Sequence, residues 1–286
     1  MTQPIQRRGF SVAVLSSCFL SGAARAQPVV PLEMGLLPNI SARTLLTQYQ
    51  PMREYLERAL QRPVHLSTAP DWASFYDRVA ATDYDLVVTA PHMARLAQVD
   101  HGWMPMLQLL PGVKGLLVQA SARPLGAIGA LRGKMLVLPN PHSLVALRGL
   151  QWLSDHGLQR GKDFSITHIP TDDSVGNVLL RGDAMAAMVS AGEFRAIPDG
   201  VRSQLQLFTE FAEVPGFMIV ACPRVIAVQF RLIKSLLLEF TSASSGEGGA
   251  FLAATGFTGF REVPPAVLAS MDEYLKATRE MLATSS

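Results

Sequence analysis

Cysteine is nearly absent from this sequence. The 286 residues include only Cys18 and Cys222, and Cys18 lies in an N-terminal segment that we expect to be removed. A mature chain with one cysteine forms no internal disulfide, so a buried core must stabilise its fold. A hydrophobic content of 49% with 17% charged residues is consistent with such a core. The 260 residues after position 26 (286 − 26) suffice for one large or two medium lobes.

An excess of charge of one sign is also lacking. The chain has 25 Lys and Arg residues against 23 Asp and Glu residues, a net charge of +2. Three arginines and no acids fall in residues 1–26, which leaves 22 basic against 23 acidic residues, or −1, in the rest. A chain without a strong positive field is not expected to bind nucleic acid or an anionic membrane surface. Any anion that it binds must be held by local groups.

Sequence motifs for catalysis and for cofactor binding are missing. There is no G-x-S-x-G nucleophile elbow and no H-E-x-x-H zinc helix. The glycine-rich stretch 126–134 fits neither a P-loop nor a dinucleotide fingerprint, and a helix and turn that lead into a strand explain it better. The six histidines show no metal-ligand spacing. We therefore predict a protein that is not an enzyme, with no metal and no cofactor.

The N-terminus has the three parts of a secretory signal peptide. Residues 1–9 are basic, residues 10–20 form an apolar run, and small residues end in an A-x-A motif at Ala26. The apolar run is shorter than the ~20 residues of a membrane-spanning helix. We expect cleavage after Ala26 and export to the periplasm. Two alternatives stay open: Arg7-Arg8 resembles a twin-arginine signal, and the stretch ending at Cys18 resembles a lipoprotein box, which would tie the protein to the membrane.

Short apolar runs alternate with helical patterns along the rest of the chain. The first set comprises strands at 29–37, 64–69 and 84–90 and helices at 44–60 and 71–80. A second set repeats this order, with strands at 134–139, 164–169 and 184–190 and helices at 143–156 and 174–181. The order strand, helix, strand, helix, strand is typical of βαβ units. It predicts two α/β lobes, each with a mostly parallel sheet flanked by helices.

Two extended segments are expected to join these lobes. One runs forward at 114–121 and the other leads back at 207–222, and helices at 225–240 and 265–282 complete the first lobe around a loop at 242–249. We place the first lobe at 27–118 and 222–286 and the second at 119–221. The hinge is expected at the crossovers 114–121 and 216–222.

A series of short motifs runs through the chain in a fixed order. They are Gly35–Pro38, Tyr49–Glu57, Pro63-Val64, Asp71-Trp72, Tyr84-Asp85, Leu131–Lys134 and Asn140–Ser143. With this order and spacing the chain resembles the periplasmic phosphate/phosphite/phosphonate-binding protein family over nearly the whole mature sequence. Members of that family deliver solutes to ATP-driven importers. The resemblance implies a type II periplasmic binding fold with two lobes, two hinge crossovers and the ligand in the cleft between the lobes.

Loops that follow the predicted strands are candidate ligand-binding positions. In open α/β sheets, ligands bind at the carboxyl ends of strands, where helix N-termini present unpaired N–H groups. Ser41 and Ser143 are also typical helix caps, and capping is compatible with ligand binding. The candidate ligand-binding residues are Asn39, Ser41, Thr89, Ala90, His92, Asn140, His142, Ser143 and Asp172.

The sequence departs from the family's pattern in the second lobe. Where the family has Ser-Thr-Ser-Gly, residues 143–146 read Ser-Leu-Val-Ala, so one hydroxyl is left. Asp172 stands where the family has a histidine, and Met185 where it has an aspartate. A carboxylate repels an anion unless it is turned away or binds an amine. We therefore expect a small anionic or zwitterionic ligand of the phosphonate, phosphite or phosphate type, or a receptor repurposed for a ligand without phosphorus.

The sequence as a whole predicts a periplasmic solute-binding protein of an ABC importer, with a membrane permease as its partner. A ligand-sensing subunit for a membrane sensor kinase is the alternative, because both roles need only a closing cleft and an exposed lobe surface. An enzyme on this fold would need a nucleophile and a base facing each other across the cleft, and the sequence shows no such pair.

Overall fold

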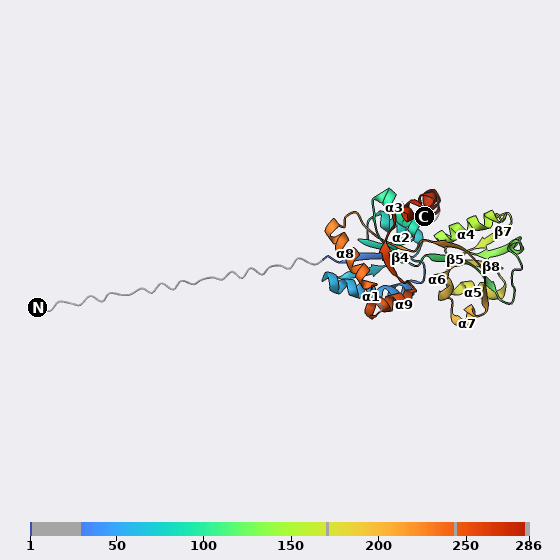
Figure 1. Cartoon of the computed structure of the whole chain (residues 1–286), viewed down its shortest axis with the longest axis horizontal. Coiled ribbons are helices and arrows are strands. Elements are labelled where there is room, and N and C mark those ends of the chain that lie inside the picture. The colour runs from blue at the N-terminus through green and yellow to red at the C-terminus, as the bar shows by residue number, and fades with distance from the viewer. Residues whose placement is uncertain (2–29, 170–171, 243–244, 284–286) are drawn as a thin grey trace.

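A computed structural model describes the protein at Met1 and at residues 30–169, 172–242 and 245–283. The signal-peptide prediction falls almost wholly outside these residues, so cleavage after Ala26 stays a prediction. Figure 1 shows two lobes side by side, each with a sheet and covering helices. Of the helices formed by the described residues, none is both long enough and apolar enough to cross a membrane.

The first lobe is built on a six-stranded sheet in the order β11-β4-β10-β3-β1-β2. Its N-terminal half follows the predicted alternation: β1 (Leu32–Leu36), α1 (Ala42–Leu60), β2 (Val64–Ser67), α2 (Trp72–Ala80), β3 (Leu86–Thr89) and α3 (Pro91–His101). Strand β1 pairs in parallel with both β2 and β3, as βαβ units require. The predicted cap at Ser41 forms, because its side chain accepts a hydrogen bond from the Thr44 N–H in the first turn of α1; Asp71, expected as the first residue of the next helix, caps α2 in the same way.

Antiparallel strands complete this sheet. They are β4 (Met104–Leu110), β10 (Met218–Ala221) and β11 (Gly259–Glu262). The sheet is thus mixed, and its parallel part is confined to β2-β1-β3. The predicted mostly parallel arrangement describes that part alone, because β10 runs opposite to both of its neighbours, β3 and β4, and β11 runs opposite to β4.

The second lobe has a five-stranded sheet in the order β7-β6-β8-β5-β9. The parallel strands β6 (Lys134–Val137), β7 (Phe164–Thr167) and β8 (Ala186–Ser190) alternate with α4 (Leu144–Asp155) and α5 (Asp172–Arg181), as predicted. Strands β5 (Val113–Ala120) and β9 (Leu205–Val214) add antiparallel pairs. The glycine-rich stretch contains a short 3-10 helix, η1 (Ile128–Leu131), which leads into β6, and two short helices, α6 (Ala191–Ala196) and α7 (Asp199–Arg202), precede β9.

The C-terminal part returns to the first lobe. Helix α8 (Ala227–Phe240) forms as predicted, but α9 (Gly246–Thr255) begins inside the expected loop at 242–249. The expected helix at 265–282 is divided into α10 (Pro265–Ala269), η2 (Asp272–Tyr274) and α11 (Leu275–Ala283). The sequence has no glycine or proline between 266 and 282 to signal that break. Tertiary packing accounts for it, because Met271 is buried against the second lobe whereas Thr278 and Leu282 are buried further along α11.

The crossovers lie closer to the sheet ends than the sequence suggested. Strand β5 belongs wholly to the second sheet and β10 wholly to the first, so the chain crosses at 111–112 and at 215–217. The predicted boundaries at 118 and 222 fall within β5 and just after β10. The crossing segments touch: a Cβ on Gly216 would lie 2.1 Å from the Leu109 carbonyl oxygen, and one on Gly112 would lie 2.8 Å from the Val214 carbonyl oxygen. The two segments that connect the sheets therefore run side by side at these two glycines.

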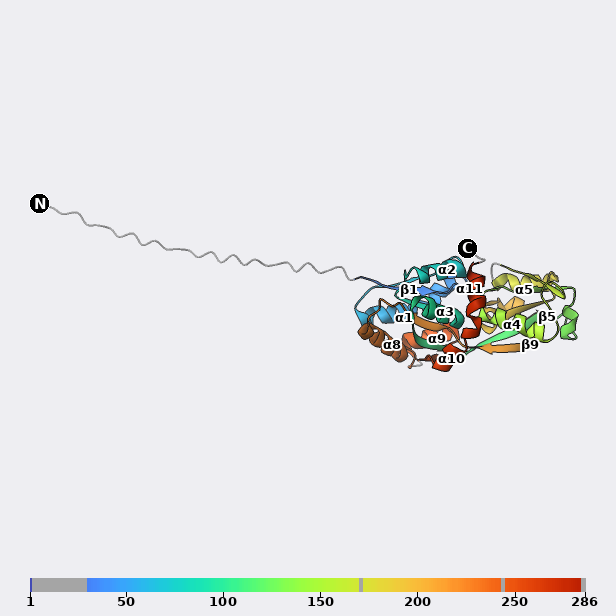
Figure 2. The ribbon, with the colours of Figure 1, turned by 90° about the horizontal axis from the view of Figure 1, so that it is seen from above.

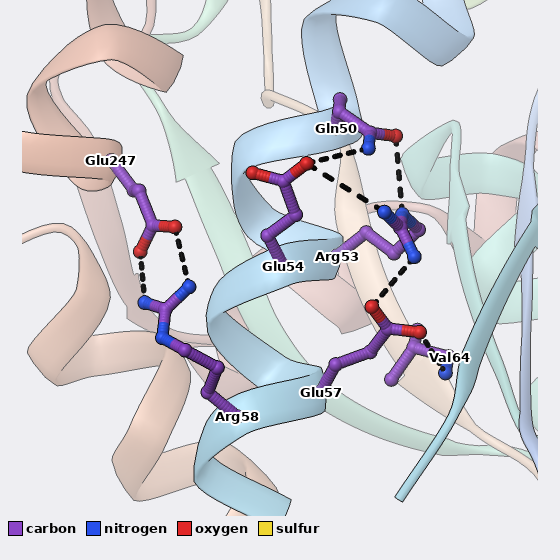
Figure 3. A network of polar contacts seen from close by, with 7 residues as sticks. All are labelled: Gln50, Arg53, Glu54, Glu57, Arg58, Val64 and Glu247. Atoms are coloured by element: carbon purple, nitrogen blue, oxygen red, sulfur yellow. Dashed lines mark hydrogen bonds and ion pairs between the residues drawn. The ribbon is translucent and has the colours of Figure 1, made fainter.

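The first lobe has one continuous core, in which α1 is tied to its neighbours by polar contacts (Figure 3). The Arg53 guanidinium donates to Glu57 Oε2 (2.6 Å), and Glu57 Oε1 accepts from the backbone N–H of Val64 in β2 (3.0 Å). Arg58 forms a two-pronged ion pair with Glu247 in α9. Such exposed pairs contribute ~1 kcal/mol or less each, so they orient α1 while the buried apolar side chains supply the stability.

Candidate functional site

The carboxyl ends of β1, β3, β6 and β8 lead into loops that meet between the lobes. Two hydrogen bonds cross the gap: His92 Nε2 lies 3.0 Å from the His142 carbonyl oxygen, and Asn140 Nδ2 lies 3.5 Å from the Asn39 carbonyl oxygen. These four residues come from both lobes and were all predicted to bind ligand. The structure therefore gathers the predicted loops at one place, as the strand-end rule for α/β sheets requires.

The loop after β1 forms the first-lobe side of the region where the loops of the two lobes meet. The indole Nε1 of Trp72 donates to the Pro38 carbonyl oxygen (3.1 Å), which fixes the loop against the start of α2. The Trp72 ring also lies 6.4 Å from the His92 ring, centroid to centroid. Asn39 is half-buried in this loop, whereas Ser41 is exposed and its hydroxyl contacts the Thr44 hydroxyl (2.8 Å). Ser41 thus lies further out than Asn39 and serves first as the cap of α1.

The end of β3 and the start of α3 carry buried polar atoms. Thr89 is 2% exposed and His92 is 0% exposed. Among the residues that the structure describes, neither Thr89 Oγ1 nor His92 Nδ1 has a hydrogen-bond partner. An unsatisfied buried polar group costs about 1–3 kcal/mol. Ala90 is the N-cap of α3 and has no side-chain oxygen that could accept a hydrogen bond from the helix. The N–H groups of the first turn of α3 can therefore donate to a ligand.

His92 is a neutral imidazole at ordinary pH. Burial lowers its pKa to about 4, against a smaller opposing effect of the hydrogen bond to the His142 carbonyl. Since a carbonyl oxygen only accepts, Nε2 carries the proton and Nδ1 is left with a lone pair. Buried in this way, His92 offers a hydrogen-bond acceptor and no positive charge.

On the second lobe, the start of α4 faces the same place. Ser143 caps α4 through a hydrogen bond from the Ala146 N–H to its Oγ (3.0 Å). His142 is half-buried, and desolvation lowers its pKa; nearby His168 lowers that pKa further, whereas Asp71 of the first lobe opposes the shift. The side chain of Asp172 lies outside the described residues, so its role stays a prediction.

Sequence reasoning missed Glu193, which joins this group from the first turn of α6. Its carboxyl is 7% exposed and accepts from the Ser190 N–H (2.5 Å) and from Asn140 Nδ2. Burial raises the pKa of the Glu193 carboxyl, and the hydrogen bonds oppose that shift. The signal was present as Ser190-x-x-Glu193 at the end of a predicted strand, which is a capping box. Glu193 holds Asn140 in the orientation in which it reaches Asn39.

The chemistry of the assembled group suits reversible binding. The described side chains at the gap supply hydroxyl, amide and imidazole groups. Among the described residues, no three His, Cys, Asp or Glu side chains come together in a way that could hold a metal ion. Hydrogen-bonding groups from both lobes can enclose a small polar ligand, whose contacts to both sides then favour closure.

Comparison with known proteins agrees with this architecture. Residues 34–268 match the family model described as "ABC transporter, phosphonate, periplasmic substrate-binding protein". Similar solved structures include PhnD1 from Prochlorococcus marinus in complex with methylphosphonate, with 15% identity, a TM-score of 0.75 and coverage of 87% of this chain and 98% of that one. A binding-protein component of an ABC phosphonate transporter from Pseudomonas aeruginosa has 14% identity, a TM-score of 0.74 and coverage of 90% and 96%. XAC2383 from Xanthomonas citri, bound to chloride ion, has 17% identity, a TM-score of 0.72 and coverage of 88% and 99%.

These structural likenesses establish the two-lobe periplasmic binding fold, and the family model covers most of the chain. The family confirms the prediction of a substrate-binding protein of an ABC importer that is periplasmic and is not an enzyme. The chain belongs to the family of periplasmic substrate-binding proteins of phosphonate ABC transporters.

Proposed function

We propose that this receptor binds a phosphonate, with or without an amino group, in the gap between its lobes, and that it closes about Gly112 and Gly216 to present the ligand to a membrane permease. The observation that supports this most directly is the pair of buried atoms Thr89 Oγ1 and His92 Nδ1, which have no described partner at the start of α3. A ligand oxygen that reaches them would remove the cost of leaving them unsatisfied. The methylphosphonate bound by a protein of the same fold supports the ligand class by analogy.

The binding groups proposed here are mostly uncharged. Thr89 donates a hydroxyl proton, α3 and α4 offer the N–H groups of their first turns, and Asn140 offers an amide. Helix N-termini carry about half a positive charge, which favours an oxyanion without a lysine or arginine at the site. His92 adds an acceptor, and a singly protonated phosphonate has the P–OH group to donate to it. A sulfonate carries no such proton at neutral pH, so this arrangement favours phosphonate over sulfonate.

The second-lobe loop contributes less than the family's pattern implies. Leu144 and Val145 stand where the family has two hydroxyl-bearing residues, and both are buried in an apolar cluster. The Ser143 hydroxyl already accepts from the Ala146 N–H, so it has its proton left to donate. Burial raises the pKa of the Glu193 carboxyl, which lowers the fraction that is ionised at a given pH. A neutral Glu193 does not repel an anion, and an ionised one would suit the ammonium of an aminoalkylphosphonate.

Replacement of Thr89 by valine tests the proposal. The change keeps the shape of the side chain and removes an unpartnered buried hydroxyl, so the ligand-free protein is expected to be as stable as the wild type or more stable by about 1 kcal/mol. Binding is expected to weaken, because the hydroxyl is needed once ligand is present. Thermal unfolding with and without ligand measures both effects. Ser235→Ala, which removes an exposed hydroxyl on α8, is the matched control and leaves both unchanged.

The ligand panel comprises phosphite, phosphate, alkylphosphonates, aminoalkylphosphonates, sulfonates, carboxylates and amino acids. A ligand at 100 times its dissociation constant adds about 2.7 kcal/mol, which raises the unfolding midpoint by roughly 5–10 °C in a chain of this size. A shift with phosphonates that shrinks in Thr89→Val supports the proposal. A shift with sulfonates or amino acids alone means that the pocket has been repurposed, and an undiminished phosphonate shift in Thr89→Val removes Thr89 from the site.

A further inference from the structure

The C-terminal segment from Met271 to Tyr274 touches both lobes. It follows the first-lobe strand β11 and the short helix α10, and it leads into α11. In both ribbon views α11 lies between α3 of the first lobe and α4 of the second (Figures 1 and 2). The segment is therefore a third link between the lobes, in addition to the two crossovers at the hinge.

On the first-lobe side, two arginine–aspartate pairs hold this segment to α3. Arg95 donates from Nε to Asp272 Oδ1 (2.7 Å) and from Nη2 to Asp272 Oδ2 (3.3 Å). Arg279 of α11 donates from Nε and Nη2 to the two carboxylate oxygens of Asp100 (2.9 and 2.6 Å). The arginine hydrogen bonds lower the pKa of both Asp272 and Asp100. Two-pronged pairs of this kind fix geometry as well as distance.

On the second-lobe side, the contact is apolar. Met271 is 3% exposed and packs in one cluster with Leu144, Val145 and Val214. Tyr274 packs against the same cluster, and its hydroxyl accepts a hydrogen bond from Arg148 Nη1 on α4 (3.2 Å). Leu144 and Val145 occupy the second and third positions of the family motif that begins at Ser143, so the apolar side chains at this loop serve a packing role.

The segment bridges the two helices that meet at the proposed ligand site. Arg95 lies about one turn after His92 on α3, and Leu144 comes two residues after His142. The hydrogen bond from His92 to the His142 carbonyl joins the same two helix starts. A rotation that parts α3 from α4 must therefore also break either the arginine–aspartate pairs or the packing around Met271.

We propose that Met271–Tyr274 is an interlobe strap that stabilises the closed lobes before ligand arrives and holds the first turn of α4 in position beside the site. The strap moves with the first lobe, to which two ion pairs tie it, and releases α4 when the lobes open. Its effect on ligand affinity rests on the proposed phosphonate function, whereas its effect on the ligand-free lobes does not. Because ligand binds the closed form, any loss of that form weakens apparent affinity in proportion.

Small-angle scattering and methylphosphonate titration together test the strap. Met271→Ala is expected to increase the radius of gyration of the ligand-free protein and to weaken methylphosphonate binding about tenfold. Met271→Leu, which keeps an apolar side chain of similar volume, restores both values. Tyr274→Phe removes only the hydroxyl that Arg148 contacts and moves both readouts in the same direction by less. Lys276→Ala, two residues after the segment in the first turn of α11 and with a side chain that is 88% exposed, is the control and changes neither.

The outcomes separate the strap from the ligand assignment. If Met271→Ala and Tyr274→Phe expand the ligand-free protein but no variant binds a phosphonate, the strap stands and the proposed function fails. If methylphosphonate binds the wild type and the radius of gyration is the same in Met271→Ala, the strap is overturned as a closing device, whatever happens to affinity. A change that Met271→Leu does not restore, or one that Lys276→Ala shares, also overturns it.

Discussion

Replacement of His92 by glutamine should remove most of the loss of folding stability at acid pH that arises from the contact between the lobes. His92 is fully buried, and burial lowers its pKa from an ordinary 6.5 to about 4. In the unfolded chain the imidazole takes up a proton near pH 6.5, but in the folded protein it does so near pH 4. The unfolded state therefore binds more protons between these values, and folding stability falls as the pH falls through that window.

The magnitude follows from the size of the shift. A difference of about 2.5 pKa units, at 1.36 kcal/mol for each unit, corresponds to about 3 kcal/mol once the pH is well below 4. At pH 4.5 the loss relative to pH 7 is about 2 kcal/mol. Glutamine keeps a donor that can reach the His142 carbonyl but does not titrate, so the variant avoids this loss.

Urea unfolding at pH 7.0, 5.5 and 4.5 measures the effect as a difference between two proteins. The free energy of unfolding of His92→Gln minus that of the wild type should rise by about 2 kcal/mol from pH 7.0 to pH 4.5. Other titrating groups, including Glu193, cancel in this difference. His65→Gln, at a histidine with a side chain that is 58% exposed, controls for the loss of an imidazole as such. Parallel pH profiles for His92→Gln and the wild type would refute the reasoning.

Three further variants test the packing and the buried carboxyl. Gly216→Ala places a Cβ 2.1 Å from the Leu109 carbonyl oxygen, so the free energy of unfolding should fall by at least ~2 kcal/mol. Gly126→Ala is the control: nothing lies near its new carbon, and the free energy of unfolding should change by less than ~0.5 kcal/mol. Equal effects of the two variants in urea unfolding would count against the tight crossover. Phe251→Ala removes a fully buried ring from the first-lobe core, so the free energy of unfolding in urea should fall by about 3–5 kcal/mol. A fall of less than about 1 kcal/mol would show that the ring is not part of the core. Burial raises the pKa of Glu193, so its contribution to stability is present below its ordinary pKa of 4.5 and is lost as the pH rises through the raised value. Glu193→Gln should therefore have a flatter stability profile than the wild type as the pH rises above 4.5, and identical slopes for the two proteins would contradict the assignment.

The changes in the second-lobe loop take on a structural meaning in this fold. From the sequence alone, Leu144 and Val145 mean that two hydroxyl donors of the family are missing. In the structure, both side chains are buried with Met271 of the C-terminal segment. A loop that would otherwise point two polar side chains at the ligand is instead packed against the other lobe. Ligand binding at the proposed site then depends on backbone N–H groups and on Thr89, His92 and Asn140.

Local sequence was sufficient for the βαβ units. Alternating apolar runs and helical stripes predicted β1 to β3 and β6 to β8 to within a few residues, because each element buries one face and that burial shows as a period in the sequence. The caps Ser41 and Ser143 were predicted from residue type and position, since a cap depends only on its own turn. Candidate loops followed from these elements, because the ends of parallel strands meet at one edge.

The tertiary structure decided what depends on contacts between distant residues. It assigned β5 and β10 to one sheet each and so placed the crossovers at 111–112 and 215–217, which no local pattern marks. It divided the C-terminal helix at Met271, whose burial depends on α4, more than a hundred residues away in the chain. It also placed Glu193 beside Asn140. The sequence by itself determined the helices and strands of the βαβ units, since that choice is made within a turn or a strand. The path between the lobes, the break in the last helix and the partners at the site arise only when the two lobes pack together.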